Sequence, residues 1–258
     1  MNYKYNIALL IALLLLNCYN KMKILNNQKY NLVWEENFDH ALNLSFWNIE
    51  IKEPGWVNNE LQAYTSDKKN LFIKDSKLHI NAIKEKDNYY TSGRLTTQQK
   101  INWQYGYFEI KAKFDSKKGT WPAIWLLSET IHEDGWPKCG EIDIMEHVNN
   151  EKQIHGSLHS DEYNHMKGNN LGNSYSIGNK IEDFNIYGLE WTKDKISWYV
   201  NDVLFYSINK KDYFKENWPY DNKYFMILNL AIGGNWPGNP SENFQSSLFI
   251  IDWIKVYQ

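Results

Sequence analysis

The chain has 258 residues, of which 43% are hydrophobic and 23% are charged, a length that suits one large domain or two small ones. One domain is favoured, because neither a linker rich in Pro, Gly or Ser nor a long internal repeat interrupts the sequence. With a net charge of -3, the chain lacks the excess positive charge that binds nucleic-acid phosphates. We therefore expect no nucleic-acid partner, and a partner without charge.

The N-terminus has the pattern of an export signal. Lys4 lies in a short polar start, and residues 7–16 form an apolar stretch too short to cross a membrane as a helix. The segment ending at Cys18 resembles a bacterial lipobox, in which the cysteine is lipidated, although Asn17 stands where a small residue is usual. We expect residues 1–18 to be a signal peptide, 19–30 a short linker and 31–258 the folded domain.

Two locations follow from this pattern. The protein is either secreted freely or anchored at the bacterial cell surface by a lipid on Cys18, which would be its only contact with a membrane. Cys18 and Cys139 are the only cysteines, so loss or lipidation of Cys18 leaves no intramolecular disulfide. Cys139 is predicted to be a buried structural thiol. No sequence feature marks an obligate interface, and we expect a monomer.

Short stretches of alternating polar and apolar residues predict an all-β protein. In residues 107–114, for example, four apolar side chains share one face of the expected strand and the charged side chains share the other. Strands are predicted at residues 71–82, 107–114, 154–159, 187–191, 196–200, 203–208, 225–231 and 249–257. Turn signals such as Asn201-Asp202 separate them. We expect two antiparallel sheets packed as a sandwich, without long amphipathic helices.

Three carboxylates lie within six residues, in Glu141-Ile142-Asp143-Ile144-Met145-Glu146. The alternation of acids with Ile predicts a strand that sends Glu141 and Asp143 to one face and Ile142 and Ile144 to the other. Glu146 breaks this phase. One extra residue at Met145, looped out as a β-bulge, would return Glu146 to the face of the other two acids.

Acids packed this closely raise one another's proton affinity, and glycoside hydrolysis uses such an arrangement. A retaining glycosidase needs an ionised carboxylate as nucleophile and a protonated carboxyl as acid, about 5 to 5.5 Å apart. We assign Glu141 as the nucleophile, Glu146 as the acid/base and Asp143 as the group that hydrogen-bonds the nucleophile and tunes its charge. The alternative is a solvated acidic edge strand.

Aromatic residues make up 16% of the chain, including 12 Trp, a surplus that suggests a groove in which indole rings stack on sugars. Trp121 and Trp125 are four residues apart, so they share one face of an extended strand. Trp136 lies in the turn that leads into the acids. These three are the candidate stacking residues, although a core position competes for any single Trp.

Polar side chains would orient the sugar hydroxyls. Asn58 lies in a segment dense in amide groups, and the planar fork of Arg94 suits fixed hydrogen bonds to sugar or carboxylate oxygens. His159 shares a face with residues 155 and 157 and would meet the acids if its strand neighbours theirs. The sequence has no His-Glu-x-x-His pattern, Cys cluster or EF-hand loop, so we expect no cofactor for catalysis.

The acid motif resembles the Glu-x-Asp-x-x-Glu signature of glycoside hydrolase family 16. The extra residue at Met145, preceded by Gly135-Trp136-Pro137, is similar to the laminarinase branch, the endo-acting β-1,3-glucanases, and differs from the lichenases. The likeness extends over nearly the whole domain. Its other segments are residues 33–39, 58–65, 92–94, 121–126, 188–191, 228–238 and 252–258.

The resemblance implies a jelly-roll β-sandwich with a concave substrate cleft, and retaining endo-hydrolysis of β-1,3-glucosidic bonds in laminarin-type β-glucans. Mixed-linkage β-1,3-1,4-glucan is a second candidate substrate. Residues 31–258 would then be the catalytic domain and a β-glucan polysaccharide its partner. The sugar contacts implied by the resemblance come from Asn58, Arg94, Trp121, Trp125, Trp136, His159, Asn235 and Trp236. Many members carry a structural calcium, for which Glu36 and Asp252 would be the ligands here, although Asn37 stands where an acid is common.

Three alternatives stay open at this point. Another family member could act on a marine galactan such as agarose, whose sugars need differently shaped or basic subsites. Related sandwiches bind β-1,3-glucan without cutting it, but those usually lack the catalytic glutamates that are present here. Transglycosylation uses the same glycosyl-enzyme intermediate as hydrolysis, and the motifs do not separate the two.

Overall fold

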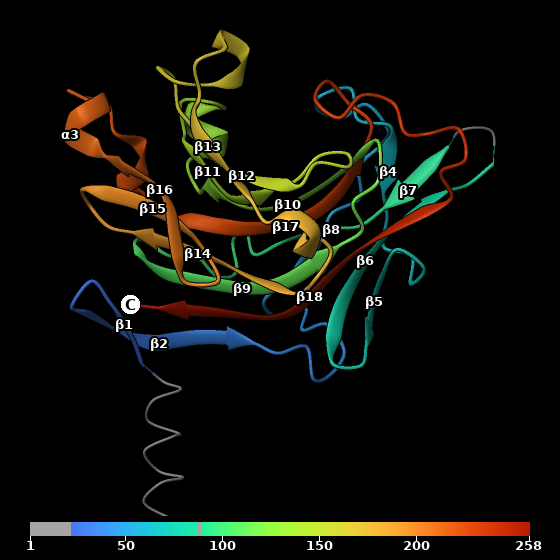
Figure 1. The fold of residues 1–258 in the computed structure, drawn as a ribbon, viewed down its shortest axis with the longest axis horizontal. Helices are drawn as coiled ribbons and strands as arrows, with labels where there is room; N and C mark the ends of the chain where they lie inside the picture. The colour runs from blue at the N-terminus through green and yellow to red at the C-terminus, as the bar shows by residue number, and fades with distance from the viewer. Residues whose placement is uncertain (1–21, 87–88) are drawn as a thin grey trace, which may run out of the picture.

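Two curved β-sheets stacked face to face form the protein in a computed structural model that describes residues 22–86 and 89–258 (Figure 1). The seven-stranded sheet has the order β13-β12-β11-β10-β17-β8-β3. Its strands are β3 (Asn48–Ile49), β8 (Arg94–Thr96), β10 (Thr120–Ser128), β11 (Glu141–Glu146), β12 (Gln153–His159), β13 (Leu171–Ser176) and β17 (Tyr224–Ile232). All neighbours in this sheet run antiparallel.

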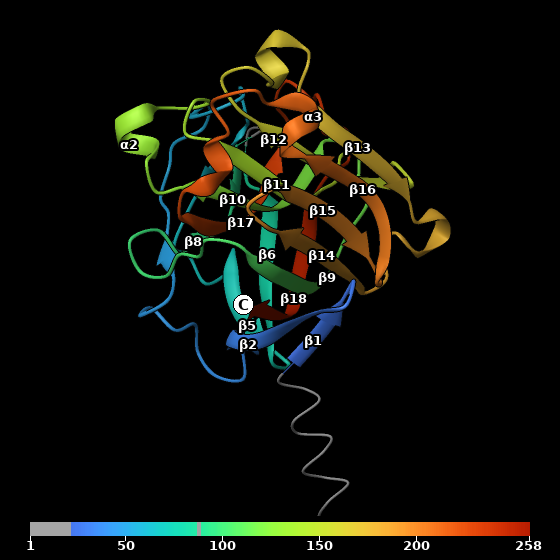
Figure 2. The same cartoon turned by 90° about the vertical axis from the view of Figure 1, so that its left-hand side faces the viewer.

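The eleven-stranded sheet covers the other side of the core. Its main path is β16-β15-β14-β9-β18-β6-β7-β4, and β1, β2 and β5 pair beside that path. The strands are β1 (Met22–Leu25), β2 (Gln28–Glu36), β4 (Gln62–Tyr64), β5 (Leu71–Lys74), β6 (Lys77–Lys84), β7 (Tyr90–Ser92), β9 (Gly106–Phe114), β14 (Asn185–Trp191), β15 (Lys195–Val200), β16 (Val203–Asn209) and β18 (Ser246–Tyr257). In the turned view of Figure 2, β2 lies beside β18 near the C-terminus.

Helices are short throughout the described residues, as the sequence predicts. They are α2 (Ile131–Asp134), α3 (Lys210–Tyr213), η1 (His165–Lys167), η2 (Gly178–Lys180) and η3 (Pro219–Asp221). None of the helices found in residues 22–86 and 89–258 is long and apolar enough to cross a membrane.

Most predicted strands are confirmed, with two differences. The stretch at 71–82 is not one strand but the hairpin β5–β6, because Asp75 and Ser76 both adopt positive φ and reverse the chain. The expected linker at 19–30 is also wrong for residues 22–30, which form the β1–β2 hairpin, with β2 joined to β18. The signal peptide at 1–18, Cys18 and residues 19–21 lie outside the described residues.

The alternating pattern determines which side chains enter the core between the sheets. On β9, the apolar set Phe108, Ile110, Ala112 and Phe114 is buried and packs toward the seven-stranded sheet. On β11, Ile142 and Ile144 enter the same core, so the acids of that strand point to the opposite face of the seven-stranded sheet.

The predicted β-bulge is present in β11, between Asp143 and Glu146. Against β10, Met145 pairs with Ile124 and Asp143 pairs with Trp125, so the unpaired residue is Ile144 and not Met145. Both bulge residues are buried in the core. Met145 is therefore part of the ladder, and the extra residue is accommodated one position earlier than expected.

A tryptophan from the opposite sheet holds this bulge. The indole Nε1 of Trp198, on β15, donates a hydrogen bond of 2.7 Å to the carbonyl of Asp143. Gly156, on β12 opposite the bulge, leaves the room for that ring, because a Cβ built there would lie 2.5 Å from the Trp198 side chain. The two sheets are thus joined by a polar contact at the point where the acids change register.

Replacing Trp198 by Phe removes the donor to a buried carbonyl, which costs about 1–3 kcal/mol in the free energy of unfolding. Urea denaturation measures this loss. We also expect faster amide hydrogen exchange at residues 144–146 than in the parent protein, since the bulge loses its support. Trp47→Phe is the matched control: it removes a buried indole that donates to Glu36, and it should destabilise without faster exchange in β11. Equal exchange in both variants would contradict the role of Trp198.

Candidate active site

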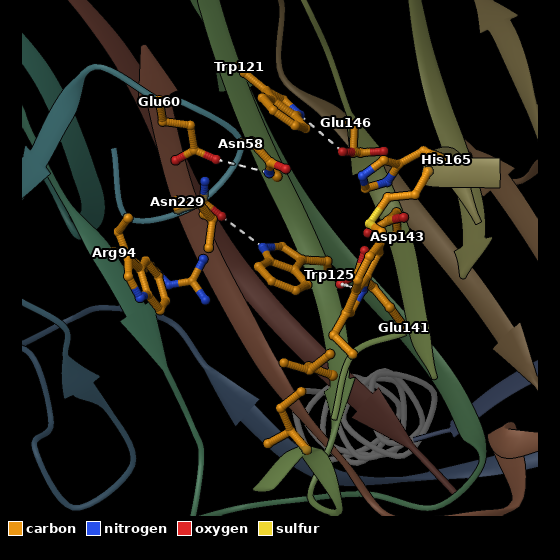
Figure 3. Close-up of a pocket in the computed structure, with 17 residues that line it drawn as sticks. Asn58, Glu60, Arg94, Trp121, Trp125, Glu141, Asp143, Glu146, His165 and Asn229 are labelled. Carbon is orange, nitrogen blue, oxygen red and sulfur yellow. Dashed lines mark hydrogen bonds between the residues drawn. The ribbon is translucent and has the colours of Figure 1, made fainter. Parts of the chain in front are cut away.

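A cavity of about 430 Å³ lies on the face of the seven-stranded sheet that carries the three acids. Its floor is formed by β10, β11 and β17, and its walls come from the loops at residues 56–60, 131–136 and 165–166. Figure 3 shows the acids along one side of the cavity, Arg94 on the other and Trp125 between them. Apolar and aromatic side chains form most of the lining, and polar groups lie on both sides of it, with the acids on one side and Arg94, Asn229, Asn58 and Glu60 away from them.

Glu141, Asp143 and Glu146 all line this cavity. The side chain of Glu141 is 13% exposed, and Asp143 and Glu146 are buried. Two indoles donate to the outer acids. Trp121 Nε1 lies 3.0 Å from Glu146 Oε1, and Trp136 Nε1 lies 3.1 Å from Glu141 Oε2 (Figure 3). The bulge therefore brings the three acids to one face, as the sequence predicts.

His159 lies beside the first two acids because β12 pairs with β11, which places Glu141 opposite His159. Its Nε2 is 3.2 Å from Asp143 Oδ2 and 3.8 Å from Glu141 Oε1. The Tyr220 hydroxyl donates to the backbone carbonyl of His159 at 2.9 Å. His159 thus supports the acids from their buried side and is not among the residues that line the cavity.

Burial and mutual repulsion raise the proton affinity of these acids. Desolvation is the main cause that raises the pKa of Glu141 to about 8, and the Asp143 and Glu146 charges add to it. Burial likewise raises the pKa of Asp143 to about 8. For Glu146, desolvation first and the Asp143 charge second raise the pKa to about 8, while the hydrogen bond from Trp121 acts in the opposite direction. The three acids cannot all be ionised together.

The wall opposite the acids is built around Arg94. Its guanidinium forms an ion pair with Glu50 and lies 4.9 Å from the centre of the Trp125 ring and 5.1 Å from that of Trp56. Trp125 is fixed in turn, because its Nε1 donates a 2.7 Å hydrogen bond to Asn229 Oδ1. Arg94 is therefore stacked between two indoles, with its charge balanced by a carboxylate.

The loop at residues 56–60 forms one end of the cavity. Asn58 has positive φ and its side-chain amide donates to Glu60 Oε1 at 3.3 Å. Asn59 donates to Asn235 Oδ1 at 2.8 Å, so the loop after β17 is joined to this one. Asn58 lines the cavity; Asn235 does not, but its backbone amide donates to the Asn58 carbonyl at 2.9 Å.

Trp236 lies just beyond the cavity lining. It is 42% exposed, and its ring is in edge contact with Trp121 at a centroid distance of 5.4 Å. His155 packs against its other side at 4.9 Å. The sequence-predicted residues thus fall into three groups. The cavity is lined by Asn58, Arg94, Trp121, Trp125, Trp136 and the three acids; His159 lies behind the acids; Asn235 and Trp236 lie outside the rim.

Several lining residues were missed by the sequence analysis. Asn229 is a single amide in the hydrophobic run of β17, and this polar interruption of a buried strand was a usable signal. Trp56 follows a Pro-Gly turn and could have been included with the other indoles. Glu60 lies on a loop, and His165 and Met166 lie in the single turn η1, where no periodicity indicates which side chain turns toward the cavity.

Glu36 and Asp252 do not fit a calcium site. The Asp252 carboxylate forms ion pairs with Lys111 at 2.9 Å and Lys77 at 3.5 Å. Glu36 accepts hydrogen bonds from the Phe38 amide and the Trp47 indole. Calcium requires six to eight oxygen ligands. The two lysines balance the charge of Asp252, and the oxygens of Glu36 are already used as hydrogen-bond acceptors, so neither carboxylate is free for the ion.

Comparison with known proteins gives a consistent set of matches. The family model described as glycosyl hydrolases family 16 matches residues 56–255. A β-glucanase of Rhodothermus marinus is 38% identical, over 89% of this chain and 85% of its own length. Among solved structures, a laminarinase from Flavobacterium sp. is 42% identical, with a TM-score of 0.82 over 88% of this chain and 100% of its own. An endo-β-1,3-glucanase from Pyrococcus furiosus has a TM-score of 0.85 at 34% identity, over 92% of this chain and 98% of its own.

The raised pKa values predict how stability depends on pH. A carboxyl with a pKa near 4.5 in the unfolded chain and about 8 when folded stabilises the fold fully below pH 4.5, and this contribution is lost as pH rises toward 8. Glu146→Gln keeps the shape and removes the charge. At pH 8 we expect the free energy of unfolding of this variant to exceed that of the parent by on the order of 1–2 kcal/mol, which raises its Tm by a few degrees. At pH 4 the two proteins should have the same Tm.

Thermal unfolding followed by circular dichroism between pH 4 and 8 measures this difference. Glu133→Gln, in the exposed helix α2, is the matched control and should follow the parent at every pH. A Glu146→Gln variant that is less stable than the parent at pH 8 would show that the buried charge is compensated, contrary to the expectation.

Proposed function

Because the chain belongs to glycosyl hydrolases family 16, we propose that it hydrolyses β-1,3-glucosidic bonds in laminarin-type β-glucans, as a retaining endo-enzyme. The observation that carries the proposal is the presentation of three acids on one face of β11, at the side of an aromatic cavity. Two of these acids are each hydrogen-bonded by an indole. The β-glucanase and laminarinase relatives support glucan as the substrate class.

The first half-reaction divides the work between Glu141 and Glu146. The Glu141 carboxylate attacks the anomeric carbon, and the bond from that carbon to the leaving oxygen breaks as Glu146 gives this oxygen its proton. The product is a glycosyl ester on Glu141, with Glu146 ionised. In the second half-reaction Glu146 takes a proton from water, the water oxygen attacks the anomeric carbon, and Glu141 is released with net retention.

Glu141 and Glu146 have equally raised pKa values, about 8, so one of them can be ionised while the other keeps its proton. Glu141 must be ionised, and the Trp136 indole N–H and the nearby imidazole of His159 favour its charged form. Glu146 must hold a proton at neutral pH, and its burial and the Asp143 charge keep it protonated. Asp143 lies between the two in sequence and beside His159, so that its protonation follows that of its neighbours. The roles of Glu141 and Glu146 are those assigned from the sequence. The expected hydrogen bond from Asp143 to Glu141 is not present among the described residues, where Asp143 Oδ2 has no hydrogen-bond partner.

The walls suggest how a glucan chain would lie. Indole faces at Trp121, Trp125 and Trp136 can stack on the apolar faces of sugars, and Asn58 and Arg94 present donors to their hydroxyls. Arg94 is already paired with Glu50, so the wall carries little free positive charge. A polysaccharide of neutral glucose units suits this lining better than the charged galactans. Mixed-linkage β-1,3-1,4-glucan remains a second candidate.

Location and assembly are further parts of the proposal. The apolar N-terminal stretch and Cys18 support export, with either free secretion or a lipid anchor at the bacterial cell surface. A monomer is proposed because one chain provides every residue of the cavity described above. No metal cofactor is proposed for the hydrolysis, since acid/base and nucleophilic roles are both filled by carboxyl groups.

Product analysis after incubation with laminarin tests the substrate and the nucleophile together. We expect short β-1,3-gluco-oligosaccharides from the parent protein and at least a 10³-fold lower kcat for Glu141→Gln, as expected for loss of a nucleophile. Lichenan and agarose are incubated in parallel. Glu133→Gln is the matched control and should keep full activity, because Glu133 lies on the exposed surface of α2. Binding of laminarin without cleavage, or cleavage of agarose alone, would contradict the proposal.

The two indole hydrogen bonds make separate predictions for the pH profile of kcat/KM. Trp121→Phe removes a donor that stabilises ionised Glu146, so the pKa of the acid/base rises and the alkaline limb moves to higher pH. Trp136→Phe raises the pKa of Glu141 for the same reason and moves the acidic limb to higher pH. About half to one pH unit is expected, since the donor favours the charged form by roughly 1 kcal/mol.

Each variant is the control for the other, because both remove one indole N–H and keep an aromatic ring in the cavity. The result that would refute the assigned roles is a shift of the acidic limb in Trp121→Phe, or of the alkaline limb in Trp136→Phe. Such an exchange of limbs would mean that Glu146 is the nucleophile and Glu141 the acid/base.

A further inference from the structure

Glu141, Asp143 and His159 bring three potential metal ligands together at the side of the cavity. One ligand atom from each residue lies within 4.8 Å of the other two. No other group of three His, Cys, Asp or Glu side chains in residues 22–86 and 89–258 meets the same condition. Two carboxylates and one imidazole form a ligand set that suits zinc and related divalent ions.

The distances between these atoms agree with the size of such an ion. A tetrahedral zinc with bonds of about 2.0–2.1 Å separates its ligand atoms by roughly 3.3 Å. His159 Nε2 lies 3.2 Å from Asp143 Oδ2 and 3.8 Å from Glu141 Oε1. The Glu141 and Asp143 oxygens lie within 4.8 Å of each other, so the Glu141 side chain would have to move toward the other two ligands to complete the geometry. The site is therefore partly formed before an ion arrives.

Two buried polar atoms of this cluster have no hydrogen-bond partner among the described residues. Asp143 Oδ2 is buried and has no hydrogen-bond partner among the described residues, and the same holds for His159 Nδ1. Asp143 and His159 are 3% and 4% exposed, so solvent reaches them only slightly. The Asp143 oxygen lies near His159 Nε2, but the contact lacks hydrogen-bond alignment. An unsatisfied buried carboxylate oxygen that faces an imidazole nitrogen is unfavourable, and a bound cation would remove this cost.

Access and charge also fit a metal ion. Glu141 and Asp143 line the open cavity, which leaves room for water as a fourth ligand. Once both carboxyl groups release their protons to an arriving ion, their two negative charges balance a divalent cation, and binding relieves the repulsion between them. Calcium and magnesium prefer six or more oxygen ligands, so this small set with one nitrogen disfavours them. The ligand number is that of a zinc site with one open position.

We propose that Glu141, Asp143 and His159 form a binding site for a zinc-class divalent cation, and that the bound ion inhibits the enzyme reversibly. The ion would bind the carboxylate of Glu141, the proposed nucleophile, and the water at its open position would lie in the cavity where the sugar binds. Cation and polysaccharide would therefore exclude each other. This inhibition is distinct from the hydrolytic function itself, because cation binding can be measured without any turnover.

Isothermal titration of the purified protein with zinc chloride, in a buffer that does not bind zinc, tests the site directly. We expect one ion per chain, and no heat beyond dilution with calcium chloride. His159→Gln should weaken zinc binding at least tenfold. His155→Gln is the matched control, because His155 forms another close imidazole–carboxylate pair, at 2.7 Å from Glu151, and its loss should leave the stoichiometry and affinity unchanged.

Asp143→Asn is a second variant for the case in which His159→Gln fails to fold, as judged by circular dichroism. It keeps the shape of the side chain and should also weaken binding at least tenfold. Absence of zinc binding to the parent protein would overturn the proposal. So would binding that survives both His159→Gln and Asp143→Asn, or binding that is lost in His155→Gln.

Competition with substrate tests the inhibitory consequence. With laminarin as substrate, zinc should raise KM without lowering kcat, and excess EDTA should restore the original KM. A short β-1,3-gluco-oligosaccharide should in turn reduce the zinc affinity in the titration. Zinc that lowers kcat at unchanged KM would place the ion elsewhere and refute the assigned site. A protein that binds zinc but cleaves no laminarin would refute the proposed function and leave the metal site intact.

Discussion

The active site depends on one irregularity, the β-bulge at Ile144 and Met145. A regular strand can present only every second residue to the cleft, so Glu146 would point into the core if β11 kept its register. The bulge returns Glu146 to the face of Glu141 and Asp143 while both of its own side chains remain buried. Trp198 binds the carbonyl at this point from the opposite sheet. The eleven-stranded sheet thereby takes part in placing the acids, through the backbone of Asp143.

Burial of these acids gives the site its reactivity. Three carboxyl groups on one face, with Trp121 and Trp136 beside them, lie in surroundings that disfavour negative charge. The fold compensates only in part, with one indole hydrogen bond to each outer acid. Full compensation would ionise all three acids and leave none to protonate a leaving group. The same raised pKa values that keep a proton available for the leaving group make the folded state less stable above neutral pH.

Local pattern and long-range pairing account for what the sequence did and did not predict. The alternation of acids with Ile predicted β11, its two faces and the need for a bulge, because these are properties of one strand. Which residue remains unpaired depends on β10, and the sequence placed it one position late. The Arg94 wall exists because β8 pairs with β17, and Trp56 reaches it from a loop. No periodicity within either segment contains that information.

Long-range contacts also distinguish the calcium site expected from the sequence from the zinc site proposed from the structure. Glu36 and Asp252 were expected to bind calcium from their resemblance to other chains, but Lys77 and Lys111 approach Asp252 from β6 and β9, which are distant in sequence. Among the described residues, no lysine or arginine forms an ion pair with the acids of β11, and His159 is the basic side chain that approaches them. A cluster of acids that lacks lysine partners must hold protons, substrate or a metal ion. Hydrolysis uses the protons and the substrate, and the ligand atoms around His159 would bind the metal ion.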